Sequence, residues 1–146
     1  MDHSTNDLLP VEFDPFSGPE ILRVLPAIEP QQEIWISCRL GGEDANRSYN
    51  ESVSLRLNGP FDQPAMEHAL RDLIARHEAL RSAFSADGRK MIVFRELPAN
   101  LYFEDLSTRQ PDEQQAFIDS FSKTEARTAF DLLTGPLFRM ALFRLG

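Results

Sequence analysis

The sequence predicts an α/β (α+β) sandwich, in which helices pack against a mixed sheet. Apolar residues alternate with polar ones at Val53, Leu55 and Leu57, which is the period of a half-buried strand. From Met66 to Ile74 the apolar residues recur at helical spacing instead. Asp87-Gly88 separates two further apolar segments and favours a tight hairpin turn. Because helix and strand patterns alternate along the chain, we expect one layered domain.

The first ordered element is predicted to be a short helix. Residues 1–24 follow neither period and are rich in Asp, Ser, Asn and Pro, so we interpret them as a linker or flexible N-terminal tail. Ordered structure is expected from near Leu25, giving one domain over residues 25–146. A helix over Gln31–Leu40 follows from Pro30 in the first turn and from Gly41-Gly42, which is expected to end it.

The remaining elements follow from the same two periods and from the turn residues between them. Asp62 is suited to cap the start of the helix that carries Met66 and Ile74, and Pro111 is suited to the first turn of a later one. The expected elements are a strand over Val53–Leu57, a helix after Asp62, hairpin strands over Leu80–Phe84 and Met91–Arg95, a strand over Leu101–Phe103, a helix from Pro111 that ends before Phe130, and a strand over Leu137–Leu145.

The charge pattern excludes two classes of partner. The chain has 146 residues and a formal net charge of -8, and its 15 Lys and Arg are scattered. Nucleic acid and anionic membrane surfaces both require clustered positive charge, so we expect neither as a partner. No signal peptide or membrane-spanning run is visible. The single cysteine, Cys38, cannot form an internal disulfide, and we expect a cytoplasmic protein.

The sequence offers no catalytic or metal-binding constellation. Its histidines are His3, His68 and His77, and no two of them have the spacing of a metal site or a paired catalytic motif. Gly41-Gly42 precedes two acidic residues, which would repel phosphate. Cys38 fits the apolar face of a helix and is interpreted as buried and structural. We therefore expect no catalytic residue, no metal and no directly bound cofactor.

One cluster is distinctive, the run from Arg76 to Phe84 across a predicted helix–strand junction. Its sequence is Arg-His-Glu-Ala-Leu-Arg-Ser-Ala-Phe, with arginines at 76 and 81. On physical grounds, arginines at such a junction more often pair with carboxylates or cap the helix than take part in catalysis. His77 is likewise interpreted as a junction residue. The residues alone therefore favour a structural role for this cluster.

This cluster resembles the Arg-His-x-x-Leu-Arg-(Ser/Thr)-x-Phe motif of nonribosomal peptide synthetase condensation domains. Other segments agree in order and spacing, and the resemblance covers about Leu25 to Gly146. These segments are Gln31 with Ile34 and Trp35, Tyr49-Asn50, Gly59-Pro60-Phe61-Asp62, Phe130-Asp131-Leu132, and Gly135-Pro136-Leu137-Phe138-Arg139. Three positions of the first motif depart from the family, namely Ile28, Pro30 and Glu33.

The resemblance implies the N-terminal half of a chloramphenicol acetyltransferase-like fold. Condensation domains join a donor acyl group to the amine of an acceptor, both carried as phosphopantetheine thioesters on carrier proteins. Their functional histidine belongs to a His-His-x-x-x-Asp-Gly motif, which this sequence lacks and which is expected beyond Gly146. The resemblance assigns Arg76 and Arg81 to bracing the active-site region and makes Gln31, Trp35, His77 and Asp131 structural motif residues.

Two functional hypotheses follow. The first is an incomplete condensation domain, inactive alone, whose partners are the remainder of that domain and peptidyl or acyl carrier protein domains. The second is a stand-alone, non-catalytic module that binds a carrier protein or another synthetase domain. In either case the open edge of the last strand, Leu137–Leu145, favours a homodimer.

Overall fold

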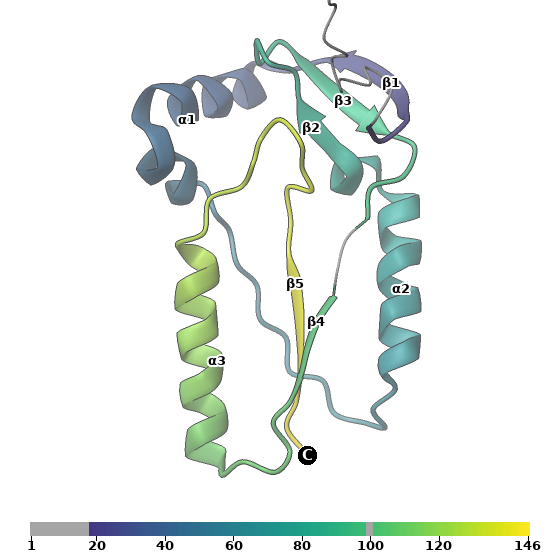
Figure 1. Ribbon diagram of the computed structural model, residues 1–146, viewed down its shortest axis with the longest axis vertical. Coiled ribbons are helices and arrows are strands. Elements are labelled where there is room, and N and C mark those ends of the chain that lie inside the picture. Colours follow the sequence, from purple (N-terminus) through teal and green to yellow (C-terminus); the bar gives the residue numbers. More distant parts are fainter. Residues whose placement is uncertain (1–17, 99–100) are drawn as a thin grey trace, which may run out of the picture.

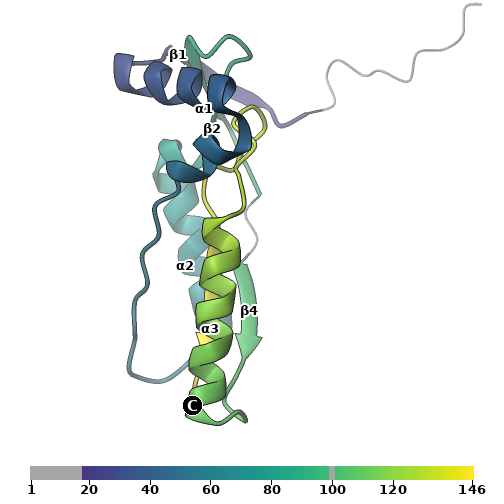
Figure 2. The ribbon, with the colours of Figure 1, turned by 90° about the vertical axis from the view of Figure 1, so that its left-hand side faces the viewer.

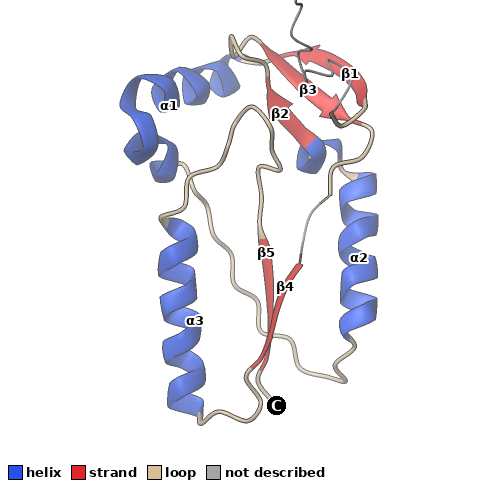
Figure 3. Ribbon diagram, viewed as in Figure 1, coloured by secondary structure: helices blue, strands red, loops and turns tan. Residues whose placement is uncertain are grey.

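The computed structural model describes residues 18–98 and 101–146. Helices and strands alternate as the fold class requires, but the strands form two separate sheets (Figures 1 and 3). The elements are β1 (Ile21–Pro26), α1 (Glu29–Ser48), α2 (Gln63–Arg76), the 3₁₀ turn η1 (Glu78–Arg81), β2 (Ser82–Phe84), β3 (Lys90–Phe94), β4 (Leu101–Asp105), α3 (Pro111–Ala126) and β5 (Met140–Arg144).

The first sheet is antiparallel and has the order β1-β3-β2. The predicted hairpin is confirmed, because Ser82 pairs with Val93 and Phe84 with Met91. Its turn requires Gly88, which has a φ of 70°. The strand β1 begins at Ile21, so ordered structure starts before the expected position near Leu25. Its backbone pairs along β3, which a local pattern of side chains does not reveal.

The second sheet consists of β4 and β5, which run parallel and are connected by α3. Both strands and the helix were predicted, although β5 is shorter than expected and begins only at Met140. Aromatic side chains join the helix to the sheet. The ring centroids of Tyr102 and Phe121 are 5.0 Å apart, and those of Phe121 and Phe143 are 5.1 Å apart. In Figure 1, α2 and α3 flank this pair of strands.

The helix predicted over Gln31–Leu40 begins slightly earlier, at Glu29, and Gly42, with φ 64° and ψ -151°, ends it as expected. A second helical stretch follows Gly42 directly, so α1 runs over Glu29–Ser48 as two helices joined at a kink. The strand predicted over Val53–Leu57 is wrong. This segment is extended but pairs with no strand among the described residues, and Leu55 is 80% exposed. A period of two specifies side-chain alternation and does not supply a partner strand.

The buried core lies mainly around the first sheet. Ala83, Phe94 and Leu97 form its central cluster, and Ile92 packs against them. Val93 and Leu106 are the largest fully buried side chains. The helix α2 starts as predicted, because the Asp62 carboxylate accepts a hydrogen bond of 2.9 Å from the backbone N–H of Ala65.

Candidate functional site: a groove and the helix–strand junction

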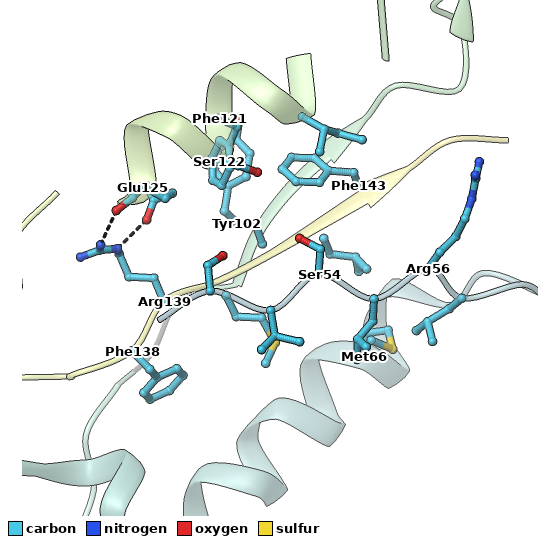
Figure 4. A pocket seen from close by; sticks show the side chains of 18 of the residues that line it. Ser54, Arg56, Met66, Tyr102, Phe121, Ser122, Glu125, Phe138, Arg139 and Phe143 are labelled. Carbon is cyan, nitrogen blue, oxygen red and sulfur yellow. Dashed lines mark hydrogen bonds and ion pairs between the residues drawn. The ribbon is translucent and has the colours of Figure 1, made fainter. Parts of the chain in front are cut away.

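A groove lies beside β5. It has a volume of about 1790 Å³ and is bounded by the extended segment Glu51–Gly59, by the start of α2, by one face of α3 and by residues 136–146. Figure 4 shows Phe121 and Phe143 on one side of it and Met66 on the other. The groove therefore lies between the two helices and between two extended stretches of backbone.

Arg139 fixes one corner of the groove. Its Nε lies 2.5 Å from a carboxylate oxygen of Glu125, and its Nη2 donates to the carbonyl oxygens of Glu125 and Thr128 at 3.0 and 2.8 Å (Figure 4 shows Arg139 beside Glu125). Its guanidinium carbon lies 3.9 Å from the ring centroid of Phe130. These contacts add a side-chain donor to the carbonyl groups at the C-terminal end of α3, where the Glu125 carbonyl also accepts the backbone N–H of Thr128 at 3.1 Å.

Tyr102 lines the same groove from β4. Its hydroxyl donates to a carboxylate oxygen of Glu104 at 3.3 Å. Partial removal from water raises the pKa of the Tyr102 phenol, and the Glu104 charge raises it further. This phenol therefore stays protonated at neutral pH, and its hydroxyl hydrogen is directed at Glu104.

The sequence motif forms a compact junction between α2 and β2. The helix ends at Arg76, and His77 caps it through its backbone N–H, which donates to the carbonyl of Leu73 at 3.0 Å. The turn η1 follows, and the Ser82 hydroxyl donates to the carbonyl of Glu78 at 2.6 Å. The chain thus turns from helix to strand over a few residues, and local hydrogen bonds hold the turn.

Arg81 is the most buried charged residue of this junction. Its Nη1 donates to the carbonyl of Phe94 at 2.5 Å, and its Nη2 lies 3.7 Å from a carboxylate oxygen of Glu78. The same Glu78 carboxylate also binds Arg23 of β1. The Nε of Arg81 is buried without a hydrogen-bond partner in the described part of the chain. A buried donor of this kind is costly to leave unpaired.

Arg76 differs from Arg81 in its surroundings. It is exposed at the last turn of α2, where a positive charge suits the negative end of the helix. Within residues 18–98 and 101–146, no ion pair or hydrogen bond joins it to another side chain. The structure therefore brings Arg81 and Glu78 together and leaves Arg76 at the surface.

Gln31 and Trp35 lie on the first half of α1. The Gln31 side chain accepts a hydrogen bond of 2.9 Å from the backbone N–H of Ile28 and so caps the helix start. The Trp35 ring covers the hairpin turn closely, since a Cβ added to Gly88 would lie 2.3 Å from its Cδ2 atom. Both contacts stabilise the fold around the first sheet, and neither residue lines the groove.

Asp131 organises the loop between α3 and β5. Its carboxylate accepts hydrogen bonds from the backbone N–H groups of Leu133 and Thr134 at 2.9 and 3.3 Å. The bond from Leu133, together with those from Thr134, lowers the pKa of the Asp131 carboxyl. The turn that it holds leads to Gly135, which packs near the backbone of Ser82. This residue therefore links the loop to the junction.

Two asparagines on or next to α1 hold the same loop, and sequence reasoning did not identify the first of them. Asn46 exchanges two hydrogen bonds with the backbone of Phe130, at 2.9 and 3.2 Å. Asn50 donates to the carbonyls of Ala126 and Thr128 at 3.1 and 3.0 Å. We call Asn46 and Asn50 the asparagine latch. The only sequence feature that pointed to this pair was Tyr49-Asn50, which is one of the segments that resemble condensation domains.

The described residues hold few candidates for other chemistry. His68 is exposed and lies 3.4 Å from Asp72, and no group of three or more potential ligands among residues 18–98 and 101–146 is arranged to hold a metal ion. Burial raises the pKa of the Cys38 thiol, which agrees with a structural role and disfavours the reactive thiolate. Among these residues, no helix is both long and apolar enough to span a bilayer.

Comparisons with known proteins agree with the geometry. The model of the condensation domain family matches residues 21–146. A linear gramicidin synthase protein of Brevibacillus parabrevis is 37% identical over 123 residues, which are 83% of this chain and 2% of that synthase. The chondramide synthase cmdD of Chondromyces crocatus is 33% identical over 123 residues, again 83% of this chain, and 3% of that protein.

Solved structures show the same fold. The condensation domain from the monacolin K polyketide synthase MokA superposes with a TM-score of 0.71 at 21% identity, over 87% of this chain and 28% of that one. The starter condensation domain of the rhizomide synthetase RzmA gives 0.67 at 22% identity, over 85% and 31%. The chain thus spans a small part of its relatives and about a third or less of these solved domains. Because the family model matches most of its length, this chain belongs to the condensation domain family.

Proposed function

We propose that this chain forms the front part of a condensation domain in a nonribosomal peptide synthetase. The parent domain joins a donor acyl group and an acceptor aminoacyl group, which are substrates held as phosphopantetheine thioesters on carrier protein domains. The family match over residues 21–146 supports the assignment, and the buried Arg81 at the centre of the intact motif is the observation that carries it.

The reaction requires a group that this sequence does not contain. The acceptor amine attacks the thioester carbon, a C–N bond forms, the C–S bond breaks, and the amine proton passes to the departing thiolate. By the resemblance, the histidine that assists belongs to the His-His-x-x-x-Asp-Gly motif. His68 and His77 are exposed and neither lines the groove, whereas His3 lies outside the described residues. We therefore propose that the chain does not catalyse condensation alone.

Arg81 is proposed to brace the active-site region of the parent. Its Nε–H is buried and unpaired in the described structure, while its other nitrogens are held by Phe94 and Glu78. A guanidinium fixed in this way is well placed to bind a carboxylate, and by the resemblance this carboxylate is the motif aspartate. Arg76 is proposed to support the same region electrostatically from the end of α2.

An amide-forming assay tests the proposal. The chain is mixed with two carrier proteins, one loaded with a donor acyl group and one with an acceptor amino acid, and the dipeptidyl thioester is measured by mass spectrometry. We expect no product above a reaction without the chain, and turnover by the chain alone would refute the proposed inactivity.

A chimera tests whether this chain can serve as the front part of an active condensation domain. In it, the part of this chain that aligns with the linear gramicidin synthase protein replaces the matching 123 residues of that protein. We expect amide formation, with thioester loading and circular dichroism as controls for folding. A chimera that folds and loads but forms no amide contradicts the assignment.

The alternative is a non-catalytic module that binds a carrier protein. The described residues form two sheets with three helices, which favours a piece that folds by itself. Titration of the labelled chain with a loaded carrier protein, followed by NMR, distinguishes it. Shifts of backbone amides without activity in the chimera favour the module, and no shifts at high concentration exclude it.

A further inference from the structure

The pair Asn58-Gly59 lies in the connection between the extended segment Glu51–Gly59 and α2, and it is the one Asn-Gly pair of the sequence. Figure 1 shows this connection at the lower end of α2. Both residues are exposed and lie outside the helices and strands. In the part of the chain that the structure describes, no hydrogen bond engages the Asn58 side chain or the backbone N–H of Gly59. The side-chain amide and the backbone nitrogen that follows it are therefore both available to react.

The glycine at this position is required by the backbone and leaves its own nitrogen unobstructed. Gly59 has a φ of 150°, a conformation that residues with a side chain rarely adopt. A Cβ built on Gly59 would meet no atom within 4 Å. The turn thus selects the residue that offers least steric resistance to attack by its backbone nitrogen on the preceding side chain.

We propose that Asn58 is a site of spontaneous deamidation, with water as the co-reactant. The backbone nitrogen of Gly59 attacks Cγ of Asn58, a C–N bond forms, the bond from Cγ to Nδ2 breaks, and ammonia leaves with the proton of the Gly59 N–H. Water then opens the cyclic imide at either carbonyl and yields aspartate or isoaspartate. Asparagine is among the residues that are chemically labile in proteins. This inference does not depend on the proposed function.

The hairpin turn shows that a following glycine is not sufficient for this reaction. Asp87-Gly88 has the same glycine, but the backbone N–H of Gly88 donates to the carbonyl of Ser85 at 2.9 Å. The Asp87 carboxylate accepts from the Ser85 hydroxyl at 2.6 Å and from the backbone N–H of Arg89 at 3.1 Å. The ring of Trp35 also lies against Gly88. Attack by the Gly88 nitrogen would first have to break these contacts.

The other asparagines of the described residues lack both conditions. Asn46 and Asn50 are followed by Arg47 and Glu51, whose side chains hinder the attack. Their own amide nitrogens donate to backbone carbonyl groups, Asn46 at 2.9 Å and Asn50 at 3.1 and 3.0 Å. Asn58 is thus the one asparagine within residues 18–98 and 101–146 that combines a following glycine with an unengaged amide.

The products differ from the original residue in two measurable ways. Either product replaces a neutral amide by a carboxylate, which adds a negative charge to a chain of net charge -8. Isoaspartate also carries the main chain through its side-chain carbon, so the backbone before α2 becomes one methylene longer. The Asp62 cap bonds to Ala65 within the helix start, so we expect α2 to remain folded after the modification.

Peptide mapping of the whole chain tests the proposal. After incubation at mildly alkaline pH, mass spectrometry should find aspartate and isoaspartate at position 58, while Asn46 and Asn50 stay intact. Isoaspartate is counted by the methyl group that a protein isoaspartate methyltransferase transfers to its carboxylate. Asn58→Gln should abolish this methyl acceptor, because the longer side chain forms the cyclic imide far more slowly. A wild-type chain that keeps its Asn58 amide overturns the proposal.

A second variant separates the structural cause from the sequence. Asp87→Asn places another Asn-Gly pair in the hairpin turn, a position that suits this pair, and circular dichroism checks that the variant folds. Each deamidation rate is divided by the rate of the same site in urea, so that effects of neighbouring residues cancel. Folding should slow the reaction at position 87 at least about tenfold more than at position 58, because the turn must open first. Equal slowing at the two positions overturns the proposal.

The chimera with the linear gramicidin synthase protein shows whether the site persists in a larger domain. Connections between elements ordinarily lie at the surface, so we expect Asn58 to deamidate in the folded chimera at a rate close to that in this chain. A chimera in which Asn58 reacts only in urea contradicts the proposal, because the amide is then engaged or covered in the native domain.

Discussion

The carboxylate of Asp131 illustrates how a single side chain holds a loop that lacks regular structure. It accepts two backbone N–H groups and thereby fixes the turn before Gly135. Hydrogen bonds of this kind favour the ionised carboxylate, so the pKa of Asp131 lies below its ordinary value in the folded chain. The stability of this loop is therefore expected to depend on pH through the protonation of Asp131.

The stability that Asp131 contributes is therefore expected to disappear in acid. Its folded pKa is lowered, so its contribution is present above the unfolded pKa of about 3.9 and is lost as the pH falls through the folded value. Wild type should exceed Asp131→Asn in free energy of unfolding at pH 7, and the difference should close below about pH 4. Urea titrations followed by the fluorescence of Trp35 measure it. If wild type remains more stable than Asp131→Asn by the same amount in strong acid, the ionised Asp131 carboxylate is not the source of the difference.

At this scale the sequence predicted local contacts and missed distant ones. Asp87-Gly88 indicated the hairpin turn correctly, but nothing near it indicated that the ring of Trp35 covers Gly88. Asn46 escaped notice because Phe130 is 84 residues away and no periodic pattern joins the two. A side chain that satisfies remote backbone groups leaves no local signature.

Among the elements, helices were more predictable than strands because their hydrogen bonds lie within the segment. The start of α2 was correct because Asp62 caps it from the adjoining position. The segment Val53–Leu57 carries an equally clear period, yet it forms no strand among the described residues, since a strand also needs a partner edge. Gly42 was correctly expected to break the helix after Leu40, but the second helical stretch that follows it was not predicted.

The junction between α2 and β2 provides a prediction about its two arginines. Arg81→Met removes the bond to the Phe94 carbonyl and the pairing with Glu78, so it should lower the free energy of unfolding by about 1 to 3 kcal/mol. Arg76→Met is the matched control and should change it by less than about 0.5 kcal/mol, since Arg76 is exposed. Urea denaturation measures the free energy of unfolding of both variants. Equal losses would contradict the conclusion that Arg81 holds the junction together while Arg76 does not.

At the scale of the molecule, the first sheet and the β4–β5 pair are joined by few contacts. One connection is the chain itself, where α2 leads into β2. Another is the loop before β5, whose Leu132 carbonyl accepts the N–H of Phe84 at 2.8 Å. The asparagine latch is the third and binds the end of α1 to the end of α3. Figure 2 shows α1 above the end of α3 in the same way.

The latch is therefore expected to couple the unfolding of the two parts. Asn46→Ala leaves both backbone groups of Phe130 without their partner, so the free energy of unfolding should fall by about 1 to 3 kcal/mol. Asn46→Asp keeps the acceptor for the Phe130 N–H and loses only the donor, so a smaller loss is expected. Hydrogen exchange should rise at the last turn of α3 and at Phe130 more than in β3, because opening starts where the latch is lost. Uniform exchange across both parts would show that Asn46 acts only on global stability and that the latch does not couple them.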